Sequence, residues 1–181
     1  MKERIIIISD LWGRRKSEWL INYTRILETE FDILFYDSCE LGQIDVAKYT
    51  QENLHKQFIN GGIDKAIDKL VESEKQKVNI LAFSIGGTIA WNFGLKTDNI
   101  KSLFCVSSTR LRNETKRPKG YLKLYFGKND EYKPTVEWFK NMALEYEILS
   151  DKGHEVYCET QFAEFLSERI IKQHHNNAYK K

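Results

Sequence analysis

The sequence predicts an α/β protein in which a mostly parallel, six-stranded sheet is covered by helices on both faces. Short apolar runs alternate along the chain with stretches whose apolar residues recur at helical spacing. The first run, residues 5–8, is isoleucine throughout, which is typical of a parallel strand buried on both faces. Strands that alternate with helices form parallel sheets, because each connection must cross back over the sheet.

Six runs rich in β-branched and aromatic residues are predicted to be strands. In order, they are residues 5–8 (IIII), 31–36 (FDILFY), 78–83 (VNILAF), 103–106 (LFCV), 122–126 (LKLYF) and 146–149 (YEIL). Helical periodicity predicts helices at residues 17–27, 51–74, 85–95, 135–143 and 158–171. Gly61 and Gly62 are expected to break or kink the second helix, and residues 37–50 are expected to form a polar loop.

The length and composition indicate one folded domain. The chain has 181 residues, of which 41% are hydrophobic and 30% charged, and this balance excludes disorder of the whole chain. We find no internal repeat and no low-complexity linker. We therefore expect a single domain over residues 1–172, followed by a polar C-terminal tail at residues 173–181.

The charge balance argues against two classes of partner. Lys and Arg total 28 against 26 Asp and Glu, a net charge of +2, whereas nucleic-acid and membrane-surface binders need concentrated positive charge. No apolar run is long enough for a membrane span or for the core of a signal peptide. Cys39, Cys105 and Cys158 lack metal-ligand spacing and are interpreted as reduced, packed thiols. We expect a cytoplasmic protein that binds neither nucleic acid nor membrane.

The carboxyl ends of the strands are where parallel sheets bind ligands. The third strand is followed by the turn AFSIGG. Ala82 and Gly86 are small enough for a sharp turn that pushes the Ser84 hydroxyl out of the sheet edge. The amide of Ile85 would then lie at a helix N-terminus and could face a developing oxyanion. A helix-capping serine or a phosphate-binding turn is the alternative interpretation.

A serine hydroxyl needs a base that accepts its proton before it is a useful nucleophile. His154 follows the sixth strand in the segment SDKGHE, where Gly153 lets the loop place an imidazole over the sheet edge. His55 falls in a predicted helix, and His174 and His175 fall in the predicted tail. For His154 taken alone, a surface loop histidine is the alternative.

A third group must orient the imidazole and stabilise its cation. The fifth strand is followed by GKNDEY, which places Asp130 just beyond the strand end, with Glu131 as a weaker candidate. A turn aspartate is the alternative, since Gly, Asn and Asp all favour turns. Ser84, Asp130 and His154 nevertheless occur in that chain order, each at or near the end of a successive predicted strand. That conjunction predicts a catalytic triad.

The second oxyanion donor is expected in the loop after the first strand, SDLWG. The backbone amide of Leu11 is the first choice and that of Trp12 the second. Trp12 is also a candidate for the wall of the acyl pocket, with surface packing as an equal alternative. A carboxylate at Asp10 would repel an oxyanion, so this side chain is expected to point away and bond the loop backbone.

These segments together resemble the α/β-hydrolase superfamily over nearly the whole chain. The matching motifs are AFSIGG, FGKND and DKGHE, while SDLWG stands where the family carries an HG-x loop. The resemblance implies Ser84 as nucleophile, His154 as base, Asp130 as acid, and an oxyanion hole from the amides of Ile85 and Leu11. It implies no metal or organic cofactor. The family's leading strands and lid have no counterpart here, so a small lidless member with an open site is expected.

The segment between the fourth and fifth strands, STRLRNETKRPKG, is strongly basic. Against one acid, Glu114, it sets five bases: Arg110, Arg112, Lys116, Arg117 and Lys119. One interpretation is an anion clamp for a substrate phosphate. The other, which we favour, is a loop kept soluble by its charge. Arg110 lies nearest the strand end and is our candidate for substrate binding.

The predicted function is that of a serine hydrolase, which cleaves a small-molecule ester or thioester through an acyl-enzyme. A non-catalytic binding protein on the same scaffold is the alternative from another class, since a fold does not determine a function. An acyltransferase or lyase that uses the same triad is a third interpretation. The sequence gives no indication of the oligomeric state.

Overall fold

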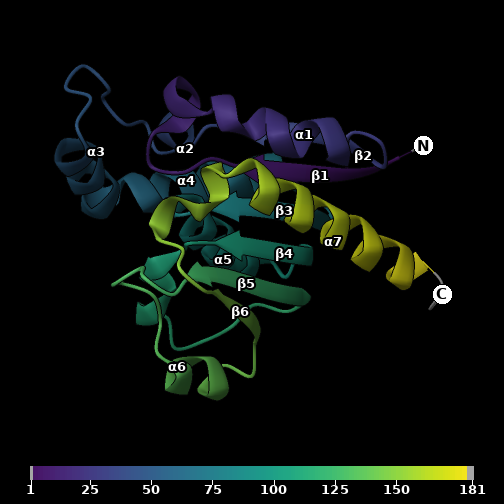
Figure 1. The fold of residues 1–181 in the computed structure, drawn as a ribbon. Helices are drawn as coiled ribbons and strands as arrows, with labels where there is room; N and C mark the ends of the chain where they lie inside the picture. The colour runs from purple at the N-terminus through teal and green to yellow at the C-terminus, as the bar shows by residue number, and fades with distance from the viewer. Residues whose placement is uncertain (1, 179–181) are drawn as a thin grey trace.

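The computed structural model describes residues 2–178, which form a six-stranded sheet with parallel pairing throughout (Figure 1). The strands are β1 (Glu3–Ile8), β2 (Phe31–Tyr36), β3 (Val78–Phe83), β4 (Ile100–Val106), β5 (Tyr121–Gly127) and β6 (Glu145–Leu149). Each strand contains one of the six predicted runs. The predicted fold class is therefore confirmed.

The strand order β2-β1-β3-β4-β5-β6 changes direction at β1. From β1 the chain moves outward to β2, and it then returns to place β3 on the other side of β1. Ile8, at the end of β1, is in register with Ala82 near the end of β3. The loops after these two strands therefore leave the same edge at the switch point, where α/β sheets bind ligands.

Helices cover both faces of the sheet. One face carries α1 (Ile21–Leu27) and α7 (Thr160–Ala178), which lie against each other (Figure 1). The other carries α2 (Ser38–Leu41), α3 (Gln51–Gln57), α4 (Ile63–Ser73), α5 (Ile85–Thr97) and α6 (Val136–Asn141). Ile5 and Ile7 pack with the first group, and Ile6 and Ile8 with the second, so the run is apolar throughout. No helix within residues 2–178 has the length and apolar character needed to span a bilayer.

The predicted break in the second helical stretch is confirmed. Between α3 and α4, residues Phe58–Gly62 form a wide turn in which Gly61 adopts a φ of +107°. Glycine reaches this conformation without the steric penalty that a side chain brings. After the turn, α4 buries Ile67 and Leu70 in the core.

The polar loop predicted for residues 37–50 is wrong in its first part. Residues 38–41 form α2, and Asp37 caps it by accepting a hydrogen bond of 2.7 Å from the Cys39 amide. Cys39 and Leu41 are buried in the core. A helix of 4 residues is too short to display a helical period, so only its capping aspartate signalled it in the sequence.

The C-terminal helix is longer than predicted. α7 continues to Ala178 instead of ending near residue 171, so residues 173–178 of the predicted polar tail are helical. The His174 ring packs against Phe31 with 4.7 Å between ring centroids, which gives this turn tertiary support that apolar spacing does not reveal. Residues 179–181 of that tail lie outside the described residues. The single domain over residues 1–172 stays a prediction.

Short 3-10 helices border the carboxyl edge of the sheet. η1 (Gly13–Lys16) and η2 (Glu18–Leu20) follow β1, η4 (Thr109–Asn113) follows β4, and η5 (His154–Cys158) follows β6. The β4–β5 connection, at residues 107–120, contains η4 alone among elements of regular structure. These short elements leave room for a cavity at this edge.

Candidate active site

The turn after β3 holds Ser84 in a rare backbone conformation. Its φ and ψ are 48° and −115°, which residues with side chains seldom adopt. The Ser84 amide donates a hydrogen bond of 2.8 Å to the Val106 carbonyl at the end of β4, and this bond fixes the turn to the sheet. The strained turn leaves the Ser84 side chain in the wall of a cavity.

Gly86, two residues after Ser84, is required by a close approach of α5 to β1. A Cβ atom at Gly86 would lie 2.4 Å from the Ser9 carbonyl oxygen and 2.8 Å from the Ile8 carbonyl oxygen. These are backbone atoms at the end of a central strand, so they cannot move aside as a flexible side chain would. The close approach explains why the turn needs a residue without a side chain at this position.

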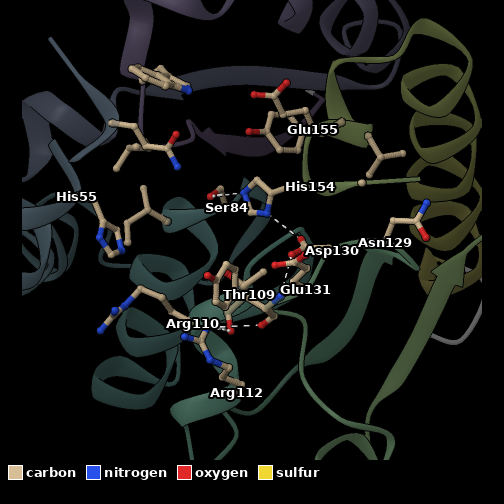
Figure 2. Close-up of a pocket in the computed structure, with 18 of the residues that line it drawn as sticks. His55, Ser84, Thr109, Arg110, Arg112, Asn129, Asp130, Glu131, His154 and Glu155 are labelled. Carbon is tan, nitrogen blue, oxygen red and sulfur yellow. Dashed lines mark hydrogen bonds and ion pairs between the residues drawn. The ribbon is translucent and has the colours of Figure 1, made fainter. Parts of the chain in front are cut away.

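His154 and Asp130 complete a hydrogen-bonded chain with Ser84 (Figure 2). Ser84 Oγ lies 3.0 Å from His154 Nε2, and His154 Nδ1 lies 2.7 Å from Asp130 Oδ2. Asp130 is 4% exposed, and its other oxygen accepts the Tyr132 amide at 3.2 Å. A carboxylate at Nδ1 favours the tautomer whose Nε2 can accept the serine proton. The neighbouring Glu131 is exposed, and Asp130 is the acid that reaches the imidazole.

The loop that carries His154 passes close to the end of β5. A Cβ atom at Gly127 would lie 2.3 Å from the Lys152 carbonyl oxygen and 2.4 Å from the Gly153 carbonyl oxygen. The Asn129 amide donates to the same Lys152 carbonyl at 2.9 Å. Gly127 therefore allows the histidine loop to approach the aspartate loop. Sequence reasoning missed this role, whose only signal was a glycine at the end of the strand before Asp130.

The two backbone amides predicted for an oxyanion hole have no competing partner in the described part of the chain. The Ile85 amide is the first of α5, and the first amides of a helix lack an intrahelical acceptor. The Leu11 amide makes no hydrogen bond with residues 2–178. The Trp12 amide, our second choice, instead donates to Asp10 Oδ1 at 2.9 Å and is therefore occupied. Both Leu11 and Ile85 line the cavity beside Ser84.

The Asp10 side chain bonds the loop backbone as expected, and it also accepts a hydrogen bond from a tyrosine of another element. It is 2% exposed, and its Oδ2 accepts a hydrogen bond of 3.1 Å from the hydroxyl of Tyr157 in η5. Burial raises the pKa of Asp10 to about 6, although the hydrogen bonds from Trp12 and Tyr157 oppose the rise. Asp10 thus links the loop after β1 to the element that begins with His154. The sequence carried no signal for the Tyr157 contact, which joins residues distant along the chain.

Ser84 and His154 open into a cavity of about 1110 Å³ at the carboxyl edge of the sheet. Leu11 and Trp12 line it from the loop after β1. The Trp12 ring also packs against Tyr49, with 5.4 Å between ring centroids, so it both lines the cavity and packs on its neighbour. The role of Trp12 in binding substrate stays a prediction.

The structure divides the basic loop into two parts. Arg110 and Arg112 line the cavity with Ser84. Arg117 instead donates to the Met142 carbonyl at 3.2 Å, and Lys119 forms an ion pair with Asp98. The interpretation that we favoured, a solvated loop kept soluble by its charge, agrees with the exposed Arg112, Lys116, Arg117 and Lys119. Arg110 differs, because it is half-buried and its Nε is buried.

None of the three cysteines forms a disulfide, and the pKa of each thiol is raised to about 12, by burial at Cys39 and Cys105 and by partial burial and nearby carboxylates at Cys158. Cys39 and Cys105 are buried, whereas Cys158 is exposed. Thiols with such pKa values are weak nucleophiles at neutral pH. Within the part of the chain that the structure describes, no three His, Cys, Asp or Glu side chains converge as metal ligands would.

Comparison with known proteins gives matches in structure and not in sequence. No family model and no curated protein matches the chain. A Xanthomonas campestris protein described as a hydrolase of the alpha/beta superfamily is 16% identical, with a TM-score of 0.67 over 95% of this chain and 99% of that chain. A Klebsiella pneumoniae protein described as a dienelactone hydrolase is 13% identical, with a TM-score of 0.70 over 94% and 85%. Est1E from Butyrivibrio proteoclasticus, with bound ferulic acid, is 14% identical, with a TM-score of 0.67 over 99% and 91%.

The fold and the site define an α/β protein with a serine, a histidine and an aspartate in one hydrogen-bonded chain at the switch point of its sheet. Its fold is that of the α/β-hydrolase superfamily, as the sequence motifs predicted. At these identities the likeness establishes the fold, and the activity has to be argued from the site.

Proposed function

We propose that the protein is a serine hydrolase that cleaves an ester or thioester of a small molecule. The observation that carries this proposal is the hydrogen-bonded chain from Ser84 through His154 to Asp130, which opens into a cavity. A hydroxyl beside an imidazole that a buried carboxylate orients has what attack on an acyl carbon requires. Several structural neighbours are described as hydrolases, among them a carboxylesterase from Bacillus subtilis, and they support the same reaction class.

In the first half-reaction, Ser84 Oγ attacks the acyl carbon while His154 Nε2 takes the hydroxyl proton. Asp130 stabilises the imidazolium that forms. The carbonyl oxygen becomes an oxyanion that the amides of Ile85 and Leu11 bind, each worth about 3 kcal/mol. His154 then gives its proton to the leaving alcohol or thiol as the bond to the acyl carbon breaks, and Ser84 carries the acyl group.

In the second half-reaction, water attacks the acyl-enzyme. His154 removes a proton from the water as it attacks, and returns it to Ser84 Oγ when the carboxylic acid leaves. The cavity is open to solvent, so water reaches the acyl group, which favours hydrolysis over transfer to a second substrate. Analysis of the products in the presence of added alcohols separates the two reactions.

The backbone strain at Ser84 favours an enzyme over a non-catalytic binding protein. A φ of 48° with a ψ of −115° is unfavourable for serine. Strain of this kind persists where the surrounding structure holds a functional group in place, and here it places a hydroxyl beside an imidazole nitrogen. A site that only bound a ligand would gain nothing from this arrangement.

Covalent labelling with a fluorophosphonate probe tests the proposal. The wild type is expected to gain one adduct on Ser84, and Ser84→Ala is expected to gain none while circular dichroism shows it folded. Ser73→Ala, which alters an exposed serine at the end of α4, is the matched control and should label like the wild type. Absence of labelling in the wild type, or equal labelling of Ser84→Ala, would refute the proposal.

A further inference from the structure

One arginine in the wall of the cavity has no partner. Arg110 lies in η4, directly after β4, and lines the cavity with Ser84. Its Nε is buried without a hydrogen-bond partner, and its guanidinium forms no hydrogen bond or ion pair with residues 2–178. A buried donor that has lost its hydration and gained no acceptor is unfavourable. A ligand that supplies an acceptor would remove this penalty.

Three of the other basic side chains of the same segment have partners, and the fourth, Lys116, is exposed to solvent outside the cavity. Arg112 donates to the Thr109 carbonyl at 2.9 Å, and its guanidinium lies over the Tyr132 ring at 5.6 Å. Arg117 and Lys119 bind partners away from the cavity, as described above. Of the two arginines that line the cavity, Arg110 is therefore the one whose guanidinium has no partner among residues 2–178.

The carboxylates around the cavity do not neutralise Arg110. Five carboxylates line the cavity, yet none forms an ion pair with Arg110: Glu52, Asp130, Glu131, Glu155 and Glu159. In Figure 2, Glu155 lies on the opposite side of the Ser84 and His154 pair from Arg110. The positive charge of Arg110 is thus available to a ligand that reaches Ser84.

The electrostatics of His55 support this. His55, on α3, lines the same cavity. Its pKa is lowered, first by burial and then by the positive charges of Arg110 and Arg112. The lowered pKa favours the neutral imidazole, so Arg110 and Arg112 are the cationic side chains of this part of the wall, while Glu52 on the same helix as His55 is an acidic one. The paired guanidiniums attract an anion that approaches them directly.

We propose that Arg110, with Arg112 beside it, binds an anionic group, a carboxylate or a phosphate, on the ester or thioester that Ser84 attacks. This inference rests on the proposed function and narrows its substrate to molecules that carry such an anion. The planar guanidinium matches both groups, because its fork of N–H donors can bind two oxygens at once. Arg110 acts here as a specificity-determining residue and takes no part in proton transfer.

A matched pair of chromogenic esters tests the inference. The p-nitrophenyl monoester of glutarate carries a free carboxylate, and its methyl-capped counterpart is neutral and otherwise alike. The measured quantity is the ratio of kcat/KM for the anionic ester to that for the neutral ester. It is compared in wild type, Arg110→Gln, Arg110→Lys and the control Lys119→Gln, whose side chain pairs with Asp98 away from the cavity. Arg110→Lys keeps the positive charge but lacks the paired N–H donors of the guanidinium. It replaces Arg110→Gln as the test variant if Arg110→Gln fails to fold.

The wild type is expected to favour the anionic ester by about tenfold to 100-fold, the range for a charged hydrogen bond. The ratio should fall to near one in Arg110→Gln, take an intermediate value in Arg110→Lys, and stay unchanged in Lys119→Gln. A large ratio that Arg110→Gln retains would overturn the inference, because another group would then bind the anion.

Calorimetric titration with glutarate and with inorganic phosphate gives a readout that does not depend on turnover. Binding of either anion that Arg110→Gln abolishes supports the inference, and the tighter ligand shows which anion the site prefers. An ester ratio near one together with no binding of either anion overturns it. If Ser84 is labelled by the fluorophosphonate but neither the ester ratio nor the calorimetry shows a preference for an anion, this inference alone is refuted. If Arg110 binds an anion but Ser84 is not labelled, the hydrolase proposal is refuted.

Discussion

The Tyr157 hydroxyl donates a hydrogen bond of 3.1 Å to Asp10 Oδ2 and so joins the loop after β1 to the 3-10 helix that begins with His154. The other carboxylate oxygen of Asp10 holds the Trp12 amide at 2.9 Å. Between them, the Leu11 amide is left free at the cavity. One buried carboxylate therefore positions both the proposed oxyanion loop and the loop of the proposed base.

Asp10→Asn is expected to change how stability depends on pH. Burial raises the pKa of Asp10 from 3.8 to about 6 in the folded state. Between these values the folded state binds more protons than the unfolded state, so the contribution of Asp10 to the free energy of unfolding falls as the pH rises. The fall amounts to about 3 kcal/mol across the window.

Urea unfolding between pH 4 and pH 7 measures this effect. The wild type should lose stability relative to Asp10→Asn as the pH rises, because the asparagine carries no charge to bury. Asp32→Asn, which alters an exposed carboxylate on β2, is the control and should follow the wild type. Parallel stability curves for the wild type and Asp10→Asn would contradict the prediction.

Gly127→Ala is expected to displace the loop of His154 and slow catalysis. The new Cβ would lie 2.3 Å from the Lys152 carbonyl oxygen, so one of the two backbones must shift, with a loss of stability of about 1–3 kcal/mol. The structure shows no need for glycine at Gly153, contrary to the expectation from the sequence, since its φ of −100° suits alanine and a Cβ there meets nothing within 4 Å. Gly153→Ala is therefore a matched control in the same loop. Fluorophosphonate labelling rates and thermal unfolding compare the two variants. Equal behaviour of both would show that the close approach does not matter.

Asp130→Asn is expected to lower kcat by about 10³–10⁴-fold while leaving the fold intact. The asparagine amide would favour the tautomer with the proton on Nε2, which cannot accept the serine proton. Glu131→Gln removes an adjacent exposed carboxylate and should keep near-normal activity. Hydrolysis of p-nitrophenyl esters measures both variants. If Glu131→Gln proves the more damaging change, the assignment of Asp130 is wrong.

The three thiols are expected to play no part in catalysis. Burial raises the pKa of Cys39 and Cys105 to about 12, and partial burial with nearby carboxylates raises that of Cys158 to about 12, so few thiolates form at pH 8. Iodoacetamide at pH 8 should react slowly with the folded protein and should leave fluorophosphonate labelling unchanged, as intact-mass spectrometry would show. Rapid loss of labelling on alkylation would point to a cysteine at the site.

The sequence predicted the fold because its strands are short and mostly apolar, and because the central strands are buried on both faces, as Ile5 to Ile8 show. It also predicted the members of the Ser84, Asp130 and His154 chain, since each follows a strand and parallel strands deliver their carboxyl ends to one edge. The spacing of apolar residues did not predict α2, because that helix is too short to show a helical period. It also did not predict the last turns of α7, which are supported by a tertiary contact of His174.

The contacts that complete the site could not be read from the sequence. The pairing of Asp10 with Tyr157 joins residues that only the fold brings together, and neither residue type predicts it. The charge pattern of residues 108–120 was visible, but which cations find partners depends on the position of Asp98 and Met142. The buried, unpartnered Nε that sets Arg110 apart depends in the same way on the fold.

The rate of Ser84 modification by a fluorophosphonate in wild type and His154→Gln tests the proposed relay most directly. Glutamine cannot take the serine proton, so the second-order rate constant should fall by about 10²–10⁴-fold, with Ser84 still the residue that reacts. Equal rates in the two proteins would show that Ser84 reacts without help from the imidazole 3.0 Å away, and would contradict the mechanism.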